Sequence, residues 1–473
     1  MIKNKVIQSG VWFTFSSFLI NAVSFFITPL FARLLTKGEY GDFSNFTSWL
    51  SIIFVVTSLN LEASLIRARF DFEQDLDRYV LSMASLSMLS TGIWFIVVML
   101  FHDFFSRLLS IDVTYLYWMF AYLFFMPVVN LFMAHQRFQY RYKASVACSM
   151  LVSLGASFLA VVLVVFMDDK MTGRVIGYVL PSALVGAFLL GYYIQKGRGI
   201  RLRYWRFALA YSLPFIPHLL SMFLLEGMDK VMVRKMCDAQ SLGLYSLAYV
   251  VGNLITVLVL AVNNAYVPWL GEQMKGEQFH WIRRISFPYA VCFTLCTGGI
   301  VLLMPEILYI MGGARYMEAI YVMPPVAAAC LLQFIYSMYV DVEQFEKKTI
   351  GMAVASMLAA GLNFVLNLIL IPRFGYLAAA YTTYAGYFFL MVMHMCLVRH
   401  IGMAKVYQTR KFLLLAMGSS MLIFASSMIL ETTWLRYGIF VIYMLAVCCV
   451  LYHYRDLWRE VKNRSPRSQD SME

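Results

Sequence analysis

Charged residues are scarce in this sequence, and their scarcity excludes a soluble protein. Only 14% of the 473 residues are Asp, Glu, Lys or Arg, whereas 61% are hydrophobic and the mean hydropathy is +0.71. A soluble domain of this length carries roughly a quarter charged residues, because its surface must be hydrated. We therefore expect an integral membrane protein, most of whose surface contacts lipid.

Long polar segments are also missing, which excludes a separate catalytic domain. The longest lie at about 272–284 and 455–473, and neither could enclose a hydrophobic core. A membrane enzyme that joins glycans would need a substantial loop outside the membrane for its catalytic groups. The longest outward loop expected here, 226–238, is too short. We expect a protein that is not an enzyme and has no catalytic residues.

The eight cysteines show no metal-binding spacing, and seven of them lie inside apolar runs. The sequence therefore predicts no metal site and no cofactor, apart from an H⁺ or Na⁺ ion that could drive transport. The net charge of +12 arises in loops such as KGRGIRLRYWR, which suit anionic lipid headgroups. Membrane lipids, and no nucleic acid, are the partners that this charge indicates.

Fourteen charge-free runs of 18 residues or more are present instead, each long enough to cross about 30 Å of hydrocarbon as a helix. They are 6–32, 43–61, 79–101, 113–134, 144–167, 175–195, 207–225, 239–271, 285–305, 319–340, 349–372, 374–398, 412–430 and 437–454. They lack the alternation of an outer-membrane barrel. The first run is too long for a signal-peptide core, so we expect an uncleaved span. The predicted fold is all-α, with about 14 transmembrane helices.

The basic residues predict the orientation of these helices. If the N-terminus lies inside, the cytoplasmic segments carry 27 Lys and Arg residues and the opposite segments carry 11. Lys and Arg concentrate on the cytoplasmic side of membrane proteins. We therefore expect both termini to be cytoplasmic.

A short polar phrase occurs twice and suggests a duplication. Residues 41–44 (Gly-Asp-Phe-Ser) align with residues 243–246 (Gly-Leu-Tyr-Ser), and Arg33 and Arg234 precede the two glycines by eight and nine residues. Each phrase follows the first span of a set of six. Because six is even, the two sets have the same orientation, as in parallel repeats.

The duplication predicts two six-helix lobes around a central cleft. The N-lobe spans 1–196 and the C-lobe spans 207–400, and the basic cytoplasmic linker 197–206 joins them. Two extra helices at 401–454 and a cytoplasmic tail at 455–473 complete the chain.

Three passages resemble Wzx-type polysaccharide flippases of the multidrug/oligosaccharidyl-lipid/polysaccharide (MOP) exporter superfamily. They are ARLLTKGEYGDFSNF, MDKVMVRKMCDAQSLGLYSLAYVVGNL and NFVLNLILIPRFGYLAAAYTTYAGY. The last is similar to the Asn-x-x-x-Asn, Ile-Pro and Phe-Gly pattern of that family. With the fourteen-helix plan, the resemblance covers nearly the whole chain.

The resemblance implies a transporter that moves lipid-linked (undecaprenyl-pyrophosphate-type) oligosaccharide units from the cytoplasmic to the periplasmic leaflet by alternating access. It implies a bacterial inner membrane location, a role in O-antigen, capsule or exopolysaccharide synthesis, and partners among other polysaccharide export or polymerase components. Two alternatives stay open, a drug/cation antiporter of the MATE type and a lipid II flippase. The resemblance does not identify the sugar.

The end of the second run carries candidate substrate-binding residues in SLNLEASLIRARF. Asn60 and Arg67 share a helix face, as do Glu62 and Arg69. Arg67 and Arg69 could donate to phosphate, because a guanidinium binds it through two parallel bonds. They could equally be ordinary positive-inside anchors.

The seventh run offers His218, Asp229 and Lys230 as further candidates. His218 and Asp229 are eleven residues apart and therefore lie on one helix face. His218 either lines the cleft or bonds a neighbouring helix. Asp229 and Lys230 either meet substrate or form a structural ion pair.

The tenth run ends with Tyr336, Tyr339, Asp341 and Glu343. Tyrosine rings beside polar groups suit sugars, although tyrosine is also common at membrane interfaces. Candidates for a coupling ion are Glu62, His218, Asp341 and Glu343, among which the sequence does not choose.

Overall fold

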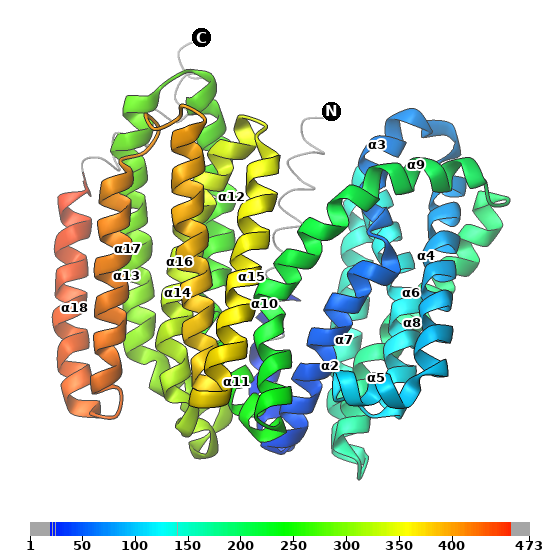
Figure 1. Ribbon diagram of the computed structural model, residues 1–473, viewed down its shortest axis with the longest axis horizontal. Coiled ribbons are helices and arrows are strands. Elements are labelled where there is room, and N and C mark those ends of the chain that lie inside the picture. The colour runs from blue at the N-terminus through cyan, green and yellow to red at the C-terminus, as the bar shows by residue number, and fades with distance from the viewer. Residues whose placement is uncertain (1–18, 21, 24, 140, 456–473) are drawn as a thin grey trace. The chain divides into compact units, whose positions relative to one another are not determined.

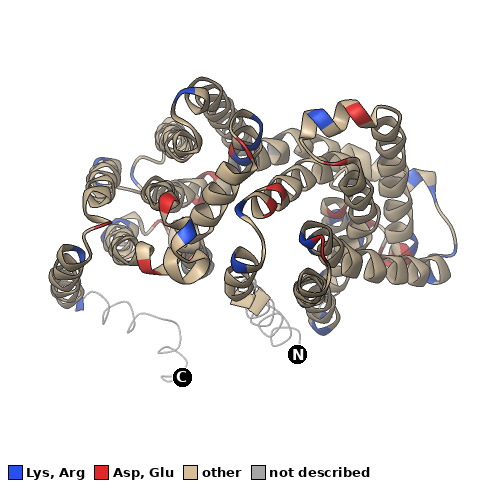
Figure 2. Ribbon diagram, turned by 90° about the horizontal axis from the view of Figure 1, so that it is seen from below, with Lys and Arg blue, Asp and Glu red and all other residues tan. Residues whose placement is uncertain are grey.

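The computed structural model describes residues 19–20, 22–23, 25–139 and 141–455, and this part of the chain is helical without a strand. Large apolar side chains point outward, with Phe166 82% and Trp434 88% exposed, as lipid contact requires. Figure 2 shows Lys, Arg, Asp and Glu on short stretches of otherwise uncharged helices. The all-α membrane class is confirmed.

The chain forms two compact units, of which the first contains the residues up to Ser246 together with 371–376. Its helices lie at Phe25–Leu34, Lys37–Ser58 (α2), Leu61–Ser64 (η1), Leu65–Asp71 (α3), Glu73–Asp75 (η2), Leu76–Leu100 (α4), His102–Leu109 (α5), Val113–Phe138 (α6), Tyr142–Phe166 (α7), Lys170–Gly197 (α8), Leu202–Ser212 (α9), Leu213–Phe215 (η3) and Ile216–Met236 (α10). In Figure 1, α4, α6, α7 and α8 lie side by side. Their buried apolar faces make the core of this unit.

The second unit contains residues 247–370 and 377–473. Its helices are Leu254–Lys275 (α12), Phe279–Gly312 (α13), Ala314–Val322 (η4), Met323–Phe345 (α14), Thr349–Phe374 (α15), Tyr376–His400 (α16), Thr409–Ser426 (α17), Ser427–Ile429 (η5) and Thr433–His453 (α18). Ala239–Gly252 (α11) begins in the first unit and ends in the second. Residues 371–376, which include the end of α15 and the first residue of α16, are grouped with the first unit. α14 is buried along most of its length and packs against α12, α13 and α17.

Each predicted run from 43–61 onward coincides with a helix or with neighbouring helices. Within the described residues, ten helices are long and apolar enough to span a membrane, or twelve if each of two bent pairs counts as one span. Most of the first run, 6–32, lies outside the described residues. The count of fourteen and the lobe boundaries stay predictions.

The two duplicated segments pack against each other at the N-termini of α2 and α11. Gly41 approaches α11 so closely that a Cβ atom there would lie 1.9 Å from the Ala239 carbonyl oxygen. A Cβ atom at Gly243 would lie 1.9 Å from the Lys37 carbonyl oxygen of α2. The contact is therefore reciprocal, and only glycine allows the backbones to come this close.

The surrounding contacts follow the same symmetry. The Ser246 hydroxyl donates to the Ser44 hydroxyl at 2.7 Å, and the two serines are 202 residues apart. Thr36 and Asp238 have the same separation, and each accepts a hydrogen bond from the backbone N–H of the third residue of its helix. The repeat seen in the sequence is thus a local structural repeat with matching caps, glycines and serines.

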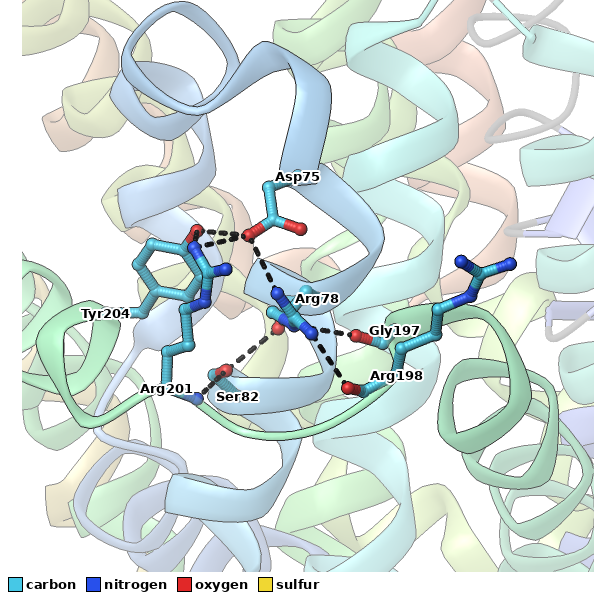
Figure 3. A network of polar contacts seen from close by, with 7 residues as sticks. All are labelled: Asp75, Arg78, Ser82, Gly197, Arg198, Arg201 and Tyr204. Carbon is cyan, nitrogen blue, oxygen red and sulfur yellow. Dashed lines mark hydrogen bonds and ion pairs between the residues drawn. The ribbon is translucent and has the colours of Figure 1, made fainter.

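The basic segment after α8 lies against α4 rather than projecting as a free tether (Figure 3). The Arg78 guanidinium donates to the carbonyl oxygens of Gly197 at 3.0 Å and Arg198 at 2.8 Å. The Arg201 backbone N–H donates to the Ser82 hydroxyl at 3.1 Å. These bonds satisfy the carbonyl groups at the C-terminus of α8.

Asp75 adds a second set of contacts from the start of α4. Its carboxylate accepts from the Tyr204 hydroxyl at 2.6 Å and pairs with the Arg201 guanidinium at 3.0 Å. The Trp205 indole donates to the Ser82 carbonyl oxygen at 2.8 Å. The predicted linker is therefore anchored to the first unit.

A buried ion pair holds the last helix against α13. Arg436 of α18 is 2% exposed and binds Glu306 through two bonds of 2.5 Å. It also donates to the Leu302 carbonyl oxygen at 2.8 Å. Arg436 is the one residue of Thr433–His453 that is buried, and the Tyr443 hydroxyl adds a second contact with α13 by donating to the Leu295 carbonyl oxygen.

Candidate functional site

The second predicted span is interrupted, and the residues at this break contribute to the candidate site. α2 ends at Ser58, and the next two residues, Leu59 and Asn60, have positive φ angles of 54° and 48°. The helix axis bends by 49° between α2 and the segment Leu61–Asp71. Non-glycine residues in this conformation cost free energy and cluster at functional sites. The break places Glu62 in a short 3₁₀ turn rather than in the regular helix expected from the sequence.

A pocket of about 470 Å³ opens beside this break, within the first unit. It is lined by Asn60, Glu62, Ala63, Ile66, Asn130, Met133, Ala134, Arg137, Phe138, Tyr211, Phe215 and Leu219. The lining comes from the α2–α3 break with the start of α3, from α6, and from the consecutive elements α9, η3 and the start of α10. Its walls are mainly apolar and its polar groups are few, as in small-molecule sites.

The polar groups of the pocket converge on Glu62. The Asn130 side chain hydrogen-bonds the Glu62 carboxyl group, and the Arg137 guanidinium lies near enough to interact with it electrostatically. Asn130 and Arg137 are seven residues apart on α6 and therefore share one helix face. A carboxylate and an amide can bind sugar hydroxyls, and a guanidinium can bind phosphate.

Of the four candidates in the segment SLNLEASLIRARF, Asn60 and Glu62 line this pocket, and Arg67 and Arg69 do not. Arg67 has a side chain that is 65% exposed and pairs with Asp71 at 3.1 Å, outside the pocket lining. The Arg69 guanidinium lies over the rings of Phe70 at 4.3 Å and Phe138 at 5.3 Å. Arg69 is thus adjacent to the pocket wall, whereas Arg67 faces away from it.

The candidates of the seventh run lie elsewhere in the first unit. Asp229 is fully buried, and its carboxylate accepts from the Tyr245 hydroxyl and from the Lys230 backbone N–H. Lys230 is half-buried beside it. Asp229 therefore joins α10 to α11 through Tyr245. Substrate contact and the ion pair with Lys230, the two alternatives from the sequence, both stay predictions. The His218 side chain lies outside the described residues.

The candidates of the tenth run all belong to the second unit. Tyr336 and Tyr339 are 9% and 0% exposed, and the Tyr339 hydroxyl donates to Thr409 at 3.4 Å. Asp341 is half-buried near the tyrosines of α12 and α13. Glu343 is paired with His394 of α16. A sugar-binding role for the two tyrosines stays a prediction, since neither ring is open to solvent here.

Sequence reasoning missed Asn130, Arg137 and Tyr211. Arg137 lies three residues beyond the charge-free run 113–134, so it was assigned to a loop, although α6 continues to Phe138. The seven-residue spacing of Asn130 and Arg137 places them on one helix face, and this pattern was the signal in the sequence that they act together. Within the described residues, no group of three His, Cys, Asp or Glu side chains could hold a metal ion.

Comparisons with known proteins agree on a family and a fold. A family described as polysaccharide biosynthesis protein matches residues 6–274. Protein 1 of the Lsg locus of Haemophilus influenzae is 22% identical over 288 residues, which are 58% of this chain and 68% of that protein.

Two solved structures share the fold. The lipid II flippase MurJ, in an inward closed conformation, aligns with a TM-score of 0.71 and 12% identity over 94% of this chain and 99% of that one. An inward-facing multidrug resistance MATE family transporter of the MOP superfamily aligns with a TM-score of 0.62 and 14% identity, over 82% and 94%. At these identities the likeness shows the fold alone.

Proposed function

Because the chain belongs to the polysaccharide biosynthesis protein family and has the fold of the MOP superfamily, we propose that it flips a lipid-linked oligosaccharide across the bacterial inner membrane. The observation that carries this proposal is the pocket at the α2–α3 break, where Glu62, Asn130 and Arg137 converge. A pyrophosphate and its sugars cannot cross hydrocarbon unaided, because desolvating charges and hydroxyl groups is costly. A polar pocket inside a membrane unit supplies replacement partners.

The three polar groups fit different parts of such a substrate. The Arg137 guanidinium binds the pyrophosphate. The Glu62 carboxylate accepts hydrogen bonds from sugar hydroxyl groups, and the Asn130 amide both donates to them and accepts from them. The apolar walls exclude competing water. The break in the helix exposes backbone groups where they line a cavity, as in other transporters with interrupted spans.

Alternating access is the second part of the proposal. The reciprocal contact of Gly41 and Gly243 joins the predicted outer ends of α2 and α11. We assign this contact to the state in which the outer side is closed and the Glu62 pocket receives substrate from the cytoplasmic leaflet. Parting of the contact would then open the outer side.

A complementation experiment tests the proposal. A strain that has lost its own flippase for surface polysaccharide should regain that polysaccharide when this chain is expressed with the matching biosynthetic enzymes. Glu62→Gln and Arg137→Gln should lower surface polysaccharide about tenfold or more at an unchanged protein level, since each removes one charged group that binds the substrate. Glu73→Gln, at an exposed carboxyl group that does not line the pocket, is the matched control and should have no effect.

The same strains separate the alternatives. A lipid II flippase would rescue growth when the cell's own lipid II flippase is depleted and leave surface polysaccharide unrestored. A drug/cation antiporter would change drug tolerance only. Full activity of the Glu62→Gln variant would remove this pocket as the substrate site.

A further inference from the structure

A buried acid–imidazole pair lies in the second unit, apart from the Glu62 pocket. Glu343 of α14 and His394 of α16 meet at 2.9 Å between Oε1 and Nδ1, with side chains 1% and 2% exposed. Both helices are candidate membrane spans. Ionisable groups inside spans are costly and usually serve transport or proton transfer.

The partners of Glu343 are incomplete for a permanently charged group. Its second oxygen, Oε2, is buried and has no hydrogen-bond partner among the described residues. In the described part of the chain, no Lys or Arg lies within 4.0 Å of this carboxyl group, and His394 is its one ionisable partner at that distance. A buried carboxylate normally has its remaining lone pairs satisfied. Glu343 therefore has an open position for a proton.

Aromatic stacking fixes the imidazole in place. The Tyr336 ring lies over the His394 ring with centroids 5.6 Å apart and planes 16° apart. The Tyr387 ring stacks on Tyr336 at 6.1 Å. Nδ1 of the stacked ring lies toward Glu343 Oε1. In the tautomer that carries its proton on Nδ1, the imidazole donates to the carboxyl group and keeps Nε2 as an acceptor.

Other ionisable groups face away from the pair or are hydrated. Asp341, on the same helix, interacts with Tyr266 of α12, Tyr289 of α13 and Tyr407 before α17. The cationic groups at the ends of the two helices are exposed; they are Lys347, Lys348, Arg399 and His400. Arg410 and Lys411 at the start of α17, which packs against α14, are also exposed. Among the described residues, Glu343 therefore forms no ion pair other than the one with His394.

We propose that Glu343 and His394 form a proton-binding site that couples transport to the proton gradient, an inference that rests on the proposed transport function. One proton, taken up at the imidazole Nε2 or the carboxylate Oε2, converts the pair from a net charge of −1 to neutral. Release of that proton restores the charge. Because a net charge buried in hydrocarbon is unfavourable, the two protonation states favour different conformations of the surrounding helices.

The chemistry favours a proton over Na⁺. Hard cations require several oxygen ligands, as the known Ca²⁺ and Mg²⁺ sites illustrate. The pair offers one free carboxylate oxygen and an imidazole nitrogen, and no cluster of three acidic, histidine or cysteine side chains exists among the described residues.

Infrared spectroscopy tests proton binding directly. The full-length protein, in vesicles of phosphatidylethanolamine and phosphatidylglycerol, is compared at acidic and alkaline pH, since carboxylate and imidazole bands report protonation. The wild type should show a band change that is absent from both Glu343→Gln and His394→Gln. The control variant Glu346→Gln, at the residue that follows the C-terminus of α14, should keep this change. Identical difference spectra for the wild type and Glu343→Gln would overturn the site.

Export tests the coupling. Glu343→Gln and His394→Gln should lower surface polysaccharide about tenfold or more, within the usual range of coupling energies, whereas Glu343→Asp should restore part of it. Glu346→Gln should export normally. If Glu343→Gln exports like the wild type, the coupling role fails and the proposed function stands. If the wild type restores no polysaccharide, the proposed function fails, and the infrared comparison still decides proton binding.

Discussion

At the scale of single residues, burial separates the arginines of this chain into two kinds. The Arg436 side chain is buried and held by Glu306 and a backbone carbonyl group, whereas the Arg67 side chain is 65% exposed beside Asp71. A buried pair is strongly destabilising to break, because the remaining partner keeps an uncompensated charge. An exposed pair contributes little, because water and salt screen it.

Replacing Arg436 should therefore destabilise the protein. We expect Arg436→Met to cost about 3–5 kcal/mol, since Glu306 would be left unpaired beside α18. The measurement is thermal unfolding in detergent. Arg67→Met is the control and should change stability by about 1 kcal/mol or less. Equal melting temperatures for Arg436→Met and the wild type would mean that the pair does not hold the helix.

Single residues also show where sequence reasoning was limited. His394 lies inside the charge-free run 374–398, and no sequence pattern links it to α14. Its partner Glu343 was a candidate, but only the fold of α14 and α16 brings the two together. Arg67 and Arg69 looked alike in the sequence, and the neighbouring rings and carboxyl group distinguish them.

At the scale of elements, the positions of the helices were predictable and their breaks were not. Hydrophobic runs reveal helices because a span must bury its own backbone hydrogen bonds. The break at Leu59 and Asn60 was not predictable, because neither residue is a glycine or a proline. Such positive φ angles persist only where the surrounding structure holds them. The position of the Glu62 pocket therefore depended on tertiary structure.

The crossing of α2 and α11 makes a sharp prediction at this scale. Gly243→Ala would place a Cβ atom on the Lys37 carbonyl oxygen, a backbone atom that cannot rotate away. We expect a loss of about 1–3 kcal/mol in thermal unfolding, as for other overpacked contacts. Gly191→Ala, a helical glycine with nothing within 4 Å of its Cβ position, should be neutral or stabilising. Equal effects of the two substitutions would contradict the close approach.

At the scale of the whole molecule, the sequence predicted the class and the duplication. The class follows from the balance of apolar and charged residues, and the duplication from the phrases around Gly41 and Gly243. The number of spans depends on helix breaks, which explains why the described residues give ten to twelve.

A cross-link tests whether the contact between α2 and α11 parts during transport. The Ser44 and Ser246 hydroxyl oxygens are 2.7 Å apart, near the S–S distance of about 2 Å in a disulfide. The double variant Ser44→Cys and Ser246→Cys should form a disulfide under oxidant, stop export, and recover when reduced. Each single variant controls for the eight native cysteines. Normal export by fully cross-linked protein would show that this contact stays closed throughout.

The reciprocity of this contact has a practical consequence. Equivalent residues touch across a local two-fold axis, which is the geometry of an isologous interface between identical subunits, here contained in one polypeptide. Equivalent substitutions on the two sides of the interface therefore test the same contact. A substitution at Gly41 should reproduce the effect of the same substitution at Gly243, and any difference between them measures how far the surroundings of the two glycines differ.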